Sequence, residues 1–468
     1  MSRPQRASQV SNKSHDVDVC CYHTLASAAG LRVDIDALNL ESVRPDPFST
    51  FEFLESFLAH DESGTPTRST LWLLTASRAG RLIGYAALSR TRKSLVGLQC
   101  STIGFAVTHD TDRPHVVARV DDIGAVTDAF FQYLLGRKRE WALLEFQQQD
   151  ETSSLFGILS GGARDGLAVR QWPSLANGTI HLRWRTFPEY LRSLPKRNRS
   201  NAGRQVRNLL AAGEVEVLAS SDPGATPAML ELYRSVEPRS WKFAANATIG
   251  RHPSRIAYFQ ALLRPTQPMR VAIQLLLLDG IPVAGLITGS FLDGLYALHI
   301  IYDANLTALA PGSLMLLMGI RHAIERRAAT FNLLSGFGYF KVRWLATMTE
   351  ARAVQVYRTD TPPFWHRLVG DAIRWALRAT ARTVPSLFNP ARRAALVPGA
   401  DPTEPVFAPL ARVGAEERVR LGALLVQARQ GQTETTSAVA LRALWPGGPA
   451  TAAPTAATLR ADSGRTAE

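Results

Sequence analysis

The residues with the clearest chemical potential lie within the stretch 302–344, where a predicted strand leads into a predicted helix. The run Pro311-Gly312-Ser313-Leu314 is typical of a helix start, because proline at the first helical position has no amide hydrogen to satisfy. Gly312 lets a ligand approach the free backbone amides, and Ser313 adds a hydroxyl. Since amides and helix dipole favour anions there, the segment predicts a phosphate site, with an ordinary capped helix as the alternative.

Four further segments carry turn, aromatic or basic residues, and each is a weak signal alone. They are Glu237-Pro238-Arg239-Ser240-Trp241-Lys242, Asp279-Gly280-Ile281-Pro282-Val283-Ala284-Gly285, residues 296–303 and Tyr339-Phe340-Lys341-Val342-Arg343-Trp344. In this order, with the helix start, they resemble the GNAT-type acyltransferase domain of the CelD-like (cellulose-biosynthesis, BioF-related) family. That family is similar to the Fem aminoacyltransferases in carrying two GNAT-like halves. The resemblance covers about residues 185–358, with a weaker echo back to about residue 48. The family usually has Asp where this chain has Asn332.

The resemblance implies an acyl-CoA-dependent N-acyltransferase, with acetyl-CoA as cosubstrate and a cell-envelope or polysaccharide precursor of a bacterial cell as acceptor. A backbone amide on a splayed strand would hold the thioester oxygen as charge develops. The expected cofactor contacts are Pro311, Gly312, Ser313, Leu314 and Lys341. The expected acceptor contacts are Arg199, Arg204, Trp241, Lys242, Tyr339 and Trp344, whose alternative roles are solvated charges and aromatic core. Arg343 is expected to contact the acceptor or the cofactor phosphates.

A base must also remove a proton from the incoming amine. Asp303, at the end of the strand nearest the helix start, is the first candidate, and Glu237 is the second. Capping a helix or turn is the alternative role of Asp303. His299 alternates with inward-facing residues on its strand, so we expect it to be structural.

The elements that must position these residues occur in the same order in both halves of the chain. Residues 47–146 predict a helix, three strands, a helix and a strand. Residues 226–334 predict two helices, three strands, a helix and a strand, which is the same order with one more helix at its start. Asp279-Gly280 and Asp293-Gly294 are tight-turn signals in the second set. With no direct sequence repeat, the shared order still predicts a duplicated α/β unit.

We therefore expect an α/β (α+β) protein with tandem GNAT-like domains, each a mixed, mostly antiparallel, twisted sheet flanked by helices. The expected divisions are a flexible segment at 1–46, an N-terminal half at 47–184, an acyltransferase domain at 185–358, a basic helical extension at 359–429 and a disordered tail at 430–468.

Charge and composition restrict the partners. The chain has 468 residues, 46% of them hydrophobic, and a formal net charge of +13, which favours anionic partners. Six basic residues and no acidic one fall in residues 192–207, a phosphate-binding face or a solvated one. Residues 364–384 predict a basic amphipathic helix, which packs on its own domain or lies on an anionic membrane surface.

Several other chemistries are not predicted. Three cysteines form no metal or disulfide pattern, HExxH and phosphate-loop motifs are absent, and no apolar run of about 18 residues occurs. The polar N-terminus lacks a signal-peptide core. We expect a cytoplasmic protein without a metal, with peripheral contact at the inner face of the membrane as an option.

Two other functions stay open. One is a Fem-like aminoacyltransferase using aminoacyl-tRNA, which the positive charge permits, although no long coiled-coil arm is visible. The other is a non-catalytic relative of the fold that binds an envelope assembly complex, an option that Asn332 keeps open.

Overall fold

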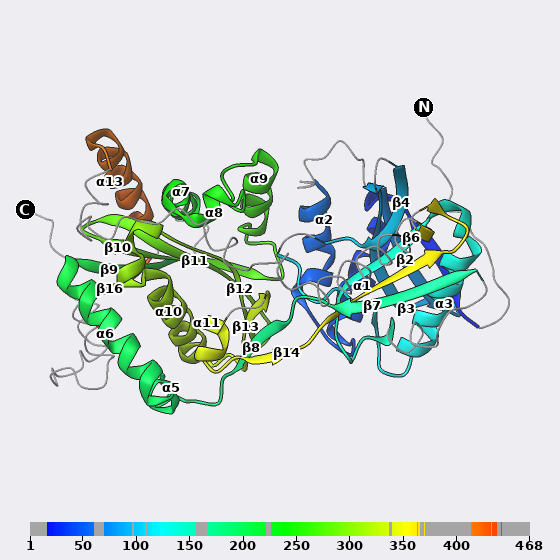
Figure 1. The fold of residues 1–468 in the computed structure, drawn as a ribbon, viewed down its shortest axis with the longest axis horizontal. Coiled ribbons are helices and arrows are strands. Elements are labelled where there is room, and N and C mark those ends of the chain that lie inside the picture. The colour runs from blue at the N-terminus through cyan, green and yellow to red at the C-terminus, as the bar shows by residue number, and fades with distance from the viewer. Residues whose placement is uncertain are drawn as a thin grey trace, which may run out of the picture.

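The chain folds into two lobes, each built on a mixed sheet flanked by helices (Figure 1). The computed structural model describes residues 16–59, 70–95, 98–107, 110–155, 166–220, 226–336, 339–362, 364–365, 369, 413–431, 433–437 and 441. Both sheets have eight strands. The predicted fold class, α/β with two mixed sheets, is confirmed.

The first sheet has the strand order β1-β2-β3-β4-β6-β15-β7, with β5 beside β3. Its strands are β1 (Asp18–Tyr22), β2 (Thr70–Arg78), β3 (Arg81–Leu95), β4 (Leu98–Phe105), β5 (Val117–Ala118), β6 (Leu143–Gln149), β7 (Leu167–Pro173) and β15 (Arg352–Arg358). All described pairings are antiparallel except β4 with β6. Helix α3 (Ile123–Gly136) packs in one apolar cluster of this sheet, and α1 (Arg32–Leu40) and α2 (Phe51–Ala59) contribute to another.

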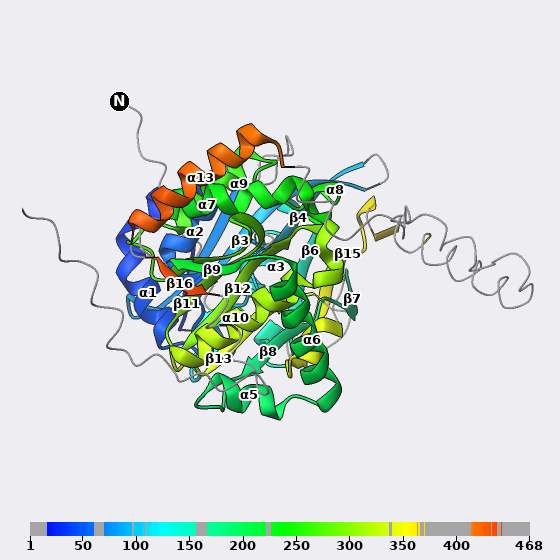
Figure 2. The same cartoon turned by 90° about the vertical axis from the view of Figure 1, so that its left-hand side faces the viewer.

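The second sheet has the order β14-β8-β13-β12-β11-β10-β9-β16. Its strands are β8 (Asn177–His181), β9 (Val215–Ser220), β10 (Arg270–Leu278), β11 (Ile281–Phe291), β12 (Gly294–Tyr302), β13 (Thr330–Ser335), β14 (Thr347–Thr349) and β16 (Glu434–Ser437). The helices that cover its two faces are α5 (Phe187–Ser193), α6 (Lys196–Ala212) and α10 (Pro311–Glu325) on one side, and α7 (Thr226–Val236), α9 (Pro253–Leu262) and α13 (Ala415–Gln430) on the other (Figure 2).

The two lobes repeat one unit. The order β2-β3-β4-α3-β6 matches β10-β11-β12-α10-β13, and in each the last strand pairs parallel with the third. The first hairpin turns at Ala79-Gly80 and at Asp279-Gly280, and all four residues have positive φ, as a type I′ turn requires. The strands and helices expected in residues 226–334 are confirmed. They could be predicted because continuous apolar runs and clear turn signals mark them.

Two strands lie in other sheets than the boundaries expected from the sequence imply. β8 precedes residue 185, yet it lies beside β13 in the second sheet. β15 ends at residue 358, yet it lies between β6 and β7 in the first sheet. The two connecting segments meet where the Ser174 amide donates to the Ala351 carbonyl at 2.8 Å. The second lobe therefore begins before residue 185, and the first lobe contains a strand, β15, that follows the second lobe in the chain.

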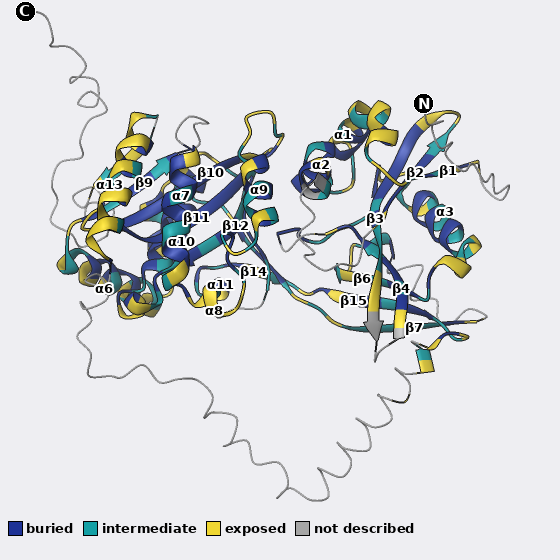
Figure 3. Cartoon of the chain, turned by 90° about the horizontal axis from the view of Figure 1, so that it is seen from above, coloured by how far each residue is buried: buried dark blue, intermediate teal, exposed yellow. Residues whose placement is uncertain are grey.

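Two predictions for the ends of the chain are wrong in part, and a third is not tested. β1 and α1 lie within residues 1–46, which we expected to be flexible, and β16 lies within the expected disordered tail, paired with β9. The basic helix expected at 364–384 lies outside the described residues except for 364–365 and 369. Figure 3 shows α6 and α13 with exposed outer faces over the buried strands of the second lobe.

Candidate functional site

The site begins where two parallel strands separate. β12 and β13 pair only at their first residues, ending with Tyr296 opposite Asn332, although both strands continue. Past this point a cavity of about 760 Å³ is lined by residues 297–300 and 302 of β12 and 333–335 of β13. The splayed strands thus form two walls of the cavity.

A bulge in β12 marks the point of separation. Ala297 pairs with Thr288 and His299 with Ile287, so Leu298 is an extra residue without an opposite partner in β11. Such a bulge bends the strand and leaves a backbone group unpaired. On the other wall, Leu334 has a φ of 57°, and its amide donates to Oδ1 of Asn332 at 2.7 Å. Both strands therefore depart from regular pairing at the cavity.

The head of α10 reaches one end of the cavity. Ala310 adopts a left-handed conformation and Pro311 is the first helical residue, as the sequence predicts. Gly312 and Ser313 line the cavity, whereas Pro311 and Leu314 do not and are buried. The amides of Ser313 and Leu314 both donate to the Ala310 carbonyl, at 3.0 and 3.3 Å, whereas no acceptor for the Gly312 amide is found within the described part of the chain.

Gly312 is required by a neighbouring ring. A Cβ at this position would lie 2.6 Å from Cδ1 of Tyr302, which also lines the cavity. The chain thus approaches the helix head on one side, while the cavity remains open beside it. Any side chain at position 312 must displace the ring or enter the space next to Ser313.

Arg343 lies at the same end of the cavity. Its Nη2 donates to Oγ of Ser313 at 2.8 Å, and its guanidinium stacks on the ring of Trp344 at 4.6 Å. Asn198 of α6 fixes the segment by donating to the Arg343 carbonyl at 3.0 Å. A guanidinium beside a helix N-terminus is a strong arrangement for binding a phosphate group. The sequence predicts contact with the cofactor phosphates as one of the two roles of Arg343, and contact with the acceptor as the other.

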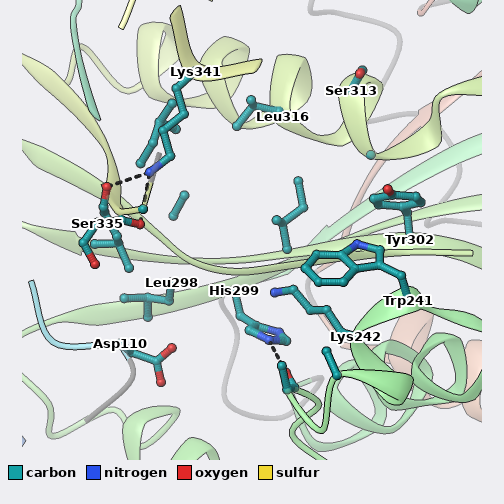
Figure 4. Close-up of a pocket in the computed structure, with 18 of the residues that line it drawn as sticks. Asp110, Trp241, Lys242, Leu298, His299, Tyr302, Ser313, Leu316, Ser335 and Lys341 are labelled. Carbon is teal, nitrogen blue, oxygen red and sulfur yellow. Dashed lines mark hydrogen bonds between the residues drawn. The ribbon is translucent and has the colours of Figure 1, made fainter. Parts of the chain in front are cut away.

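The cavity is also lined by four ionisable side chains from different elements, Asp110, Lys242, Arg255 and His299. Figure 4 shows Asp110, Lys242 and His299 on the side of the cavity across from Ser313. Asp110 comes from the first lobe, and its Oδ1 lies 3.5 Å from Nη2 of Arg255 in α9. The cavity is therefore formed by both lobes. No local motif surrounds Asp110, so the sequence alone does not predict its place in the site.

The repeated unit explains how Asp110 arrives there. In the first lobe, the Ala106 amide donates to Ala87, and the pairing with β3 resumes only where Val117 meets Tyr85. Residues 107–116 are thus inserted at the position where the second lobe has the single bulged residue Leu298. This insertion carries Asp110 across to the cavity of the other lobe.

Burial lowers the pKa of two lysines that line the cavity. The pKa of Lys341 falls to about 8, opposed by the charge of Asp112, and its Nζ donates to the carbonyls of Leu334 and Ser335 at 2.8 and 3.1 Å. The pKa of Lys242, in the short helix α8 (Trp241–Ala244), also falls to about 8 through burial, opposed by Asp110. Lys341 therefore holds the turn after β13, whereas Lys242 extends toward His299 (Figure 4).

His299 has a structural bonding pattern, although it lines the cavity. Its Nδ1 lies 2.6 Å from the hydroxyl of Tyr233, and its Nε2 lies 3.3 Å from the Ala247 carbonyl. Burial, with Lys242 and Arg255 nearby, holds the pKa of His299 well below its ordinary value. The ring is neutral at pH 7, with Nε2 as donor and Nδ1 as acceptor from the Tyr233 hydroxyl.

The two carboxylates expected as bases lie away from the cavity lining. Asp303 is 0% exposed, accepts from Nε of Arg239 at 2.6 Å, and accepts from the amide and side chain of Asn305 at 3.0 and 2.9 Å. Glu237 accepts from the amides of Ile249 and Gly250 at 2.6 and 2.7 Å, and burial raises its pKa. In the structure both residues therefore hold a loop in place. For Asp303 this is the capping role that was the alternative to acting as the base.

The expected acceptor contacts divide into two groups. Trp241 and Trp344 both line the cavity, Trp241 at 53% exposure near its edge and Trp344 at 1%. Arg199 and Arg204 lie on α6 away from the lining, and Arg199 donates to the Arg192 carbonyl at 2.8 Å. The side chain of Tyr339 lies outside the described part of the chain.

Asn332 ties the second lobe to the insertion of the first. Its Nδ2 donates to Oδ2 of Asp112 at 3.3 Å, and Asn177 of β8 donates to the same oxygen at 2.6 Å and to Oδ1 of Asn332 at 3.0 Å. An aspartate at 332 would face the carboxylate of Asp112. The departure from the family pattern thus matches a contact between the lobes.

Among the described residues, no group of three or more His, Cys, Asp or Glu is placed to hold a metal ion. No helix within the described ranges combines the length and apolar character needed to cross a bilayer.

Comparison with known proteins gives one family match. Residues 196–342 match the model of the acetyltransferase (GNAT) domain, which runs from α6 to the segment containing Lys341. The narrower CelD-like assignment stays an expectation. No curated protein matches the chain.

Solved structures with a similar fold were found at low sequence identity. One is FemX, at 13% identity and a TM-score of 0.47, covering 69% of this chain and 95% of FemX. A tandem GNAT protein from the clavulanic acid biosynthesis pathway has 12% identity and a TM-score of 0.43, covering 74% and 99%. The C-terminal domain of a putative lysylphosphatidylglycerol synthetase from Agrobacterium fabrum has 11% identity and a TM-score of 0.43, covering 75% and 96%.

Proposed function

We propose that the protein transfers an acyl group, in the simplest case acetyl, from a CoA thioester to an amine held in the cavity between β12 and β13. The observation that carries the proposal is the cavity itself. It starts at the splay of two parallel strands and ends at the head of α10, within the segment that matches the GNAT model. A long, narrow thioester cosubstrate needs such a channel with an anion site at one end.

The residues present fit CoA at the α10 end. The Gly312 amide, the Ser313 hydroxyl and the Arg343 guanidinium offer donors to a diphosphate from three directions. The helix head can lie this close to the Tyr302 ring because residue 312 has no side chain. The apolar lining by Leu298, Ile300 and Leu316 suits the uncharged arm of the cosubstrate.

The reaction then follows from position. The amine nitrogen attacks the thioester carbonyl carbon, a C–N bond forms, the C–S bond breaks, and CoA leaves as the thiolate with the electron pair. Holding both reactants in one cavity lowers the barrier through orientation. The unpaired backbone group at the Leu298 bulge is placed to stabilise the oxyanion. Asp110 is the carboxylate that lines the cavity, and we assign it to receive the proton of the amine.

The acceptor class rests on the family resemblance. A cell-envelope or polysaccharide precursor is the substrate that the resemblance implies, and aminoacyl-tRNA would replace acyl-CoA in a Fem-like enzyme. A non-catalytic binding protein would need neither cosubstrate.

Ligand stabilisation separates these possibilities. A ligand present at about 100 times its Kd stabilises the folded protein by about 2.7 kcal/mol, which a melting curve resolves. Acetyl-CoA should raise the Tm. Dephospho-CoA and adenosine are tested separately as matched controls, and comparing their shifts shows which part of CoA binds. A rise with aminoacyl-tRNA and none with acetyl-CoA would replace the proposal by the Fem-like function. No rise with either would leave the binding-protein function.

A further inference from the structure

We infer that the acceptor amine carries an anionic group close to its nitrogen, and that Lys242 selects this group. The inference rests on the proposed acyl transfer and names the chemical class of its acceptor. It predicts an amino acid, a peptide end or a phosphorylated amine rather than a neutral amine or a polyamine.

Lys242 is placed to meet a ligand rather than a side chain. It lines the cavity from α8, and its amine extends inward toward His299 (Figure 4). Within the described part of the chain, no hydrogen bond or ion pair of its Nζ is found. The cavity lining also includes the apolar residues Ala245, Ala247 and Leu298. A cation removed from water without a partner costs free energy, which a ligand anion offsets.

Among the described residues, no carboxylate forms an ion pair with Lys242. Asp110 and Glu237 act on the Lys242 pKa through their charges, but burial and Arg255 oppose them, and the pKa falls to about 8. Asp110 itself lies 3.5 Å from Arg255, and Glu237 accepts from two backbone amides. His299 is neutral at pH 7 because burial holds its pKa low. An anion beside the Lys242 amine would therefore meet a cation that has no ion-pair partner in the described part of the chain.

This anion site is separate from the one assigned to the CoA diphosphate. The diphosphate donors come from α10 and from Arg343 in α11 (Tyr339–Arg343), whereas Lys242 comes from α8. Both ends belong to one cavity, so a molecule between them carries its reacting carbon near the β12 bulge. The acceptor would place its amine toward Asp110 and its anionic group toward Lys242.

The test uses CoA as an anchor, so it needs no knowledge of the natural acceptor. Three thioether conjugates are compared, in which the CoA sulfur carries an acetyl-linked glycine, glycinamide or aminomethylphosphonate. They differ only in the terminal group, which is a carboxylate, a neutral amide or a phosphonate. Their Kd values are measured by calorimetry at pH 7 with the full-length protein and with three variants, Lys242→Met, Lys242→Arg and Lys138→Met. Lys138 is an exposed lysine of the first lobe and serves as the matched control.

The wild type should bind the better anionic conjugate about tenfold more tightly than the glycinamide conjugate, the effect of one charge-assisted contact. Lys242→Met should reduce this ratio to about twofold or less, while Lys242→Arg and Lys138→Met should retain most of it. The tighter of the two anionic conjugates identifies a carboxylate or a phosphate as the group selected. Plain CoA should bind all four proteins equally.

Two results would overturn the inference, and they differ from failure of the proposed function. Equal Kd values of the three conjugates in the wild type would show that no anion is selected. A preference that persists in Lys242→Met would assign the selection to another residue. In both cases the conjugates still bind, so the acyltransferase proposal stands. If CoA and all conjugates fail to bind the wild type, the proposed function fails, and the inference fails with it.

Discussion

Position determines which carboxylates can meet a ligand in the cavity. Asp303 and Glu237, the carboxylates that sequence position favours, are held by Arg239 and by backbone amides. Asp110, which no motif marks, lines the cavity. Sequence reasoning placed the helix head correctly because Pro311 and Gly312 have local conformational preferences. The direction in which a buried carboxylate points depends on residues far away in the sequence, so it could not be predicted from local patterns.

Lys341 should make stability depend on pH. Burial lowers its folded-state pKa to about 8, below the ordinary value of 10.5. Between these two values the unfolded chain binds more protons than the folded one, so the free energy of unfolding rises with pH. Lys341→Met should remove this rise, as measured by urea unfolding of both proteins from pH 7.5 to 10.5. Parallel profiles across that range would show that Lys341 titrates normally.

Asp303→Asn should act on stability. The substitution leaves the Arg239 guanidinium without its buried carboxylate, which costs about 3 kcal/mol for a buried pair. Urea unfolding measures the loss, and acetyl-CoA affinity of the folded protein should remain within about twofold, since Asp303 does not line the cavity. Wild-type stability with turnover reduced by about a hundredfold would instead support Asp303 as the base.

The geometry of the site depends on contacts between pairs of neighbouring elements. The splay of β12 and β13 needs the bulge at Leu298 and the left-handed Leu334, and Asn332 fixes the second of these. Apolar runs predict both strands. The one-residue bulge depends on how β12 pairs with β11, and the sequence of one strand does not show that pairing. The insertion at 107–116 could not be assigned from sequence for the same reason, because its contacts lie in the other lobe.

Asn332→Asp should destabilise the contact between β13 and the insertion. The new carboxylate would face Oδ2 of Asp112, where the Asn332 amide now donates at 3.3 Å. A buried like-charge pair should cost about 3 kcal/mol in the free energy of unfolding. Adding Asp112→Asn should restore at least half of the loss, since an amide again faces a carboxylate. Additive losses in the double variant would contradict the pairing.

β15 links the two lobes, because it follows the second lobe in the chain and lies in the first sheet. β8 was expected in the first half and β15 in the second, and the structure pairs each with strands of the other sheet. Local patterns identify a strand but carry little information on which sheet receives it, since both sheets offer an edge after their parallel pair. The duplicated order of elements was predictable because each unit repeats the same apolar spacing and the same kind of turn.

Unfolding of the whole molecule should therefore be a single transition. β15 belongs to the first sheet but follows the second lobe in the chain, and the two segments that connect the lobes are hydrogen-bonded to each other through Ser174 and Ala351. Circular dichroism and tryptophan fluorescence should give coincident urea curves. Two separated transitions, each assigned to one lobe, would show that β15 and the paired connections do not couple the lobes.

The most direct test of acyl transfer in this cavity is the affinity for acetyl-CoA of two variants of one glycine. Gly312→Ala and Gly312→Asp place the same Cβ against Tyr302, so the difference between them isolates the added carboxylate at the helix head. Calorimetry should show wild-type binding, with the aspartate variant weaker than the alanine variant by at least about tenfold, because like charges oppose the diphosphate. Equal affinities of the two variants, or no binding by the wild type, would contradict the account.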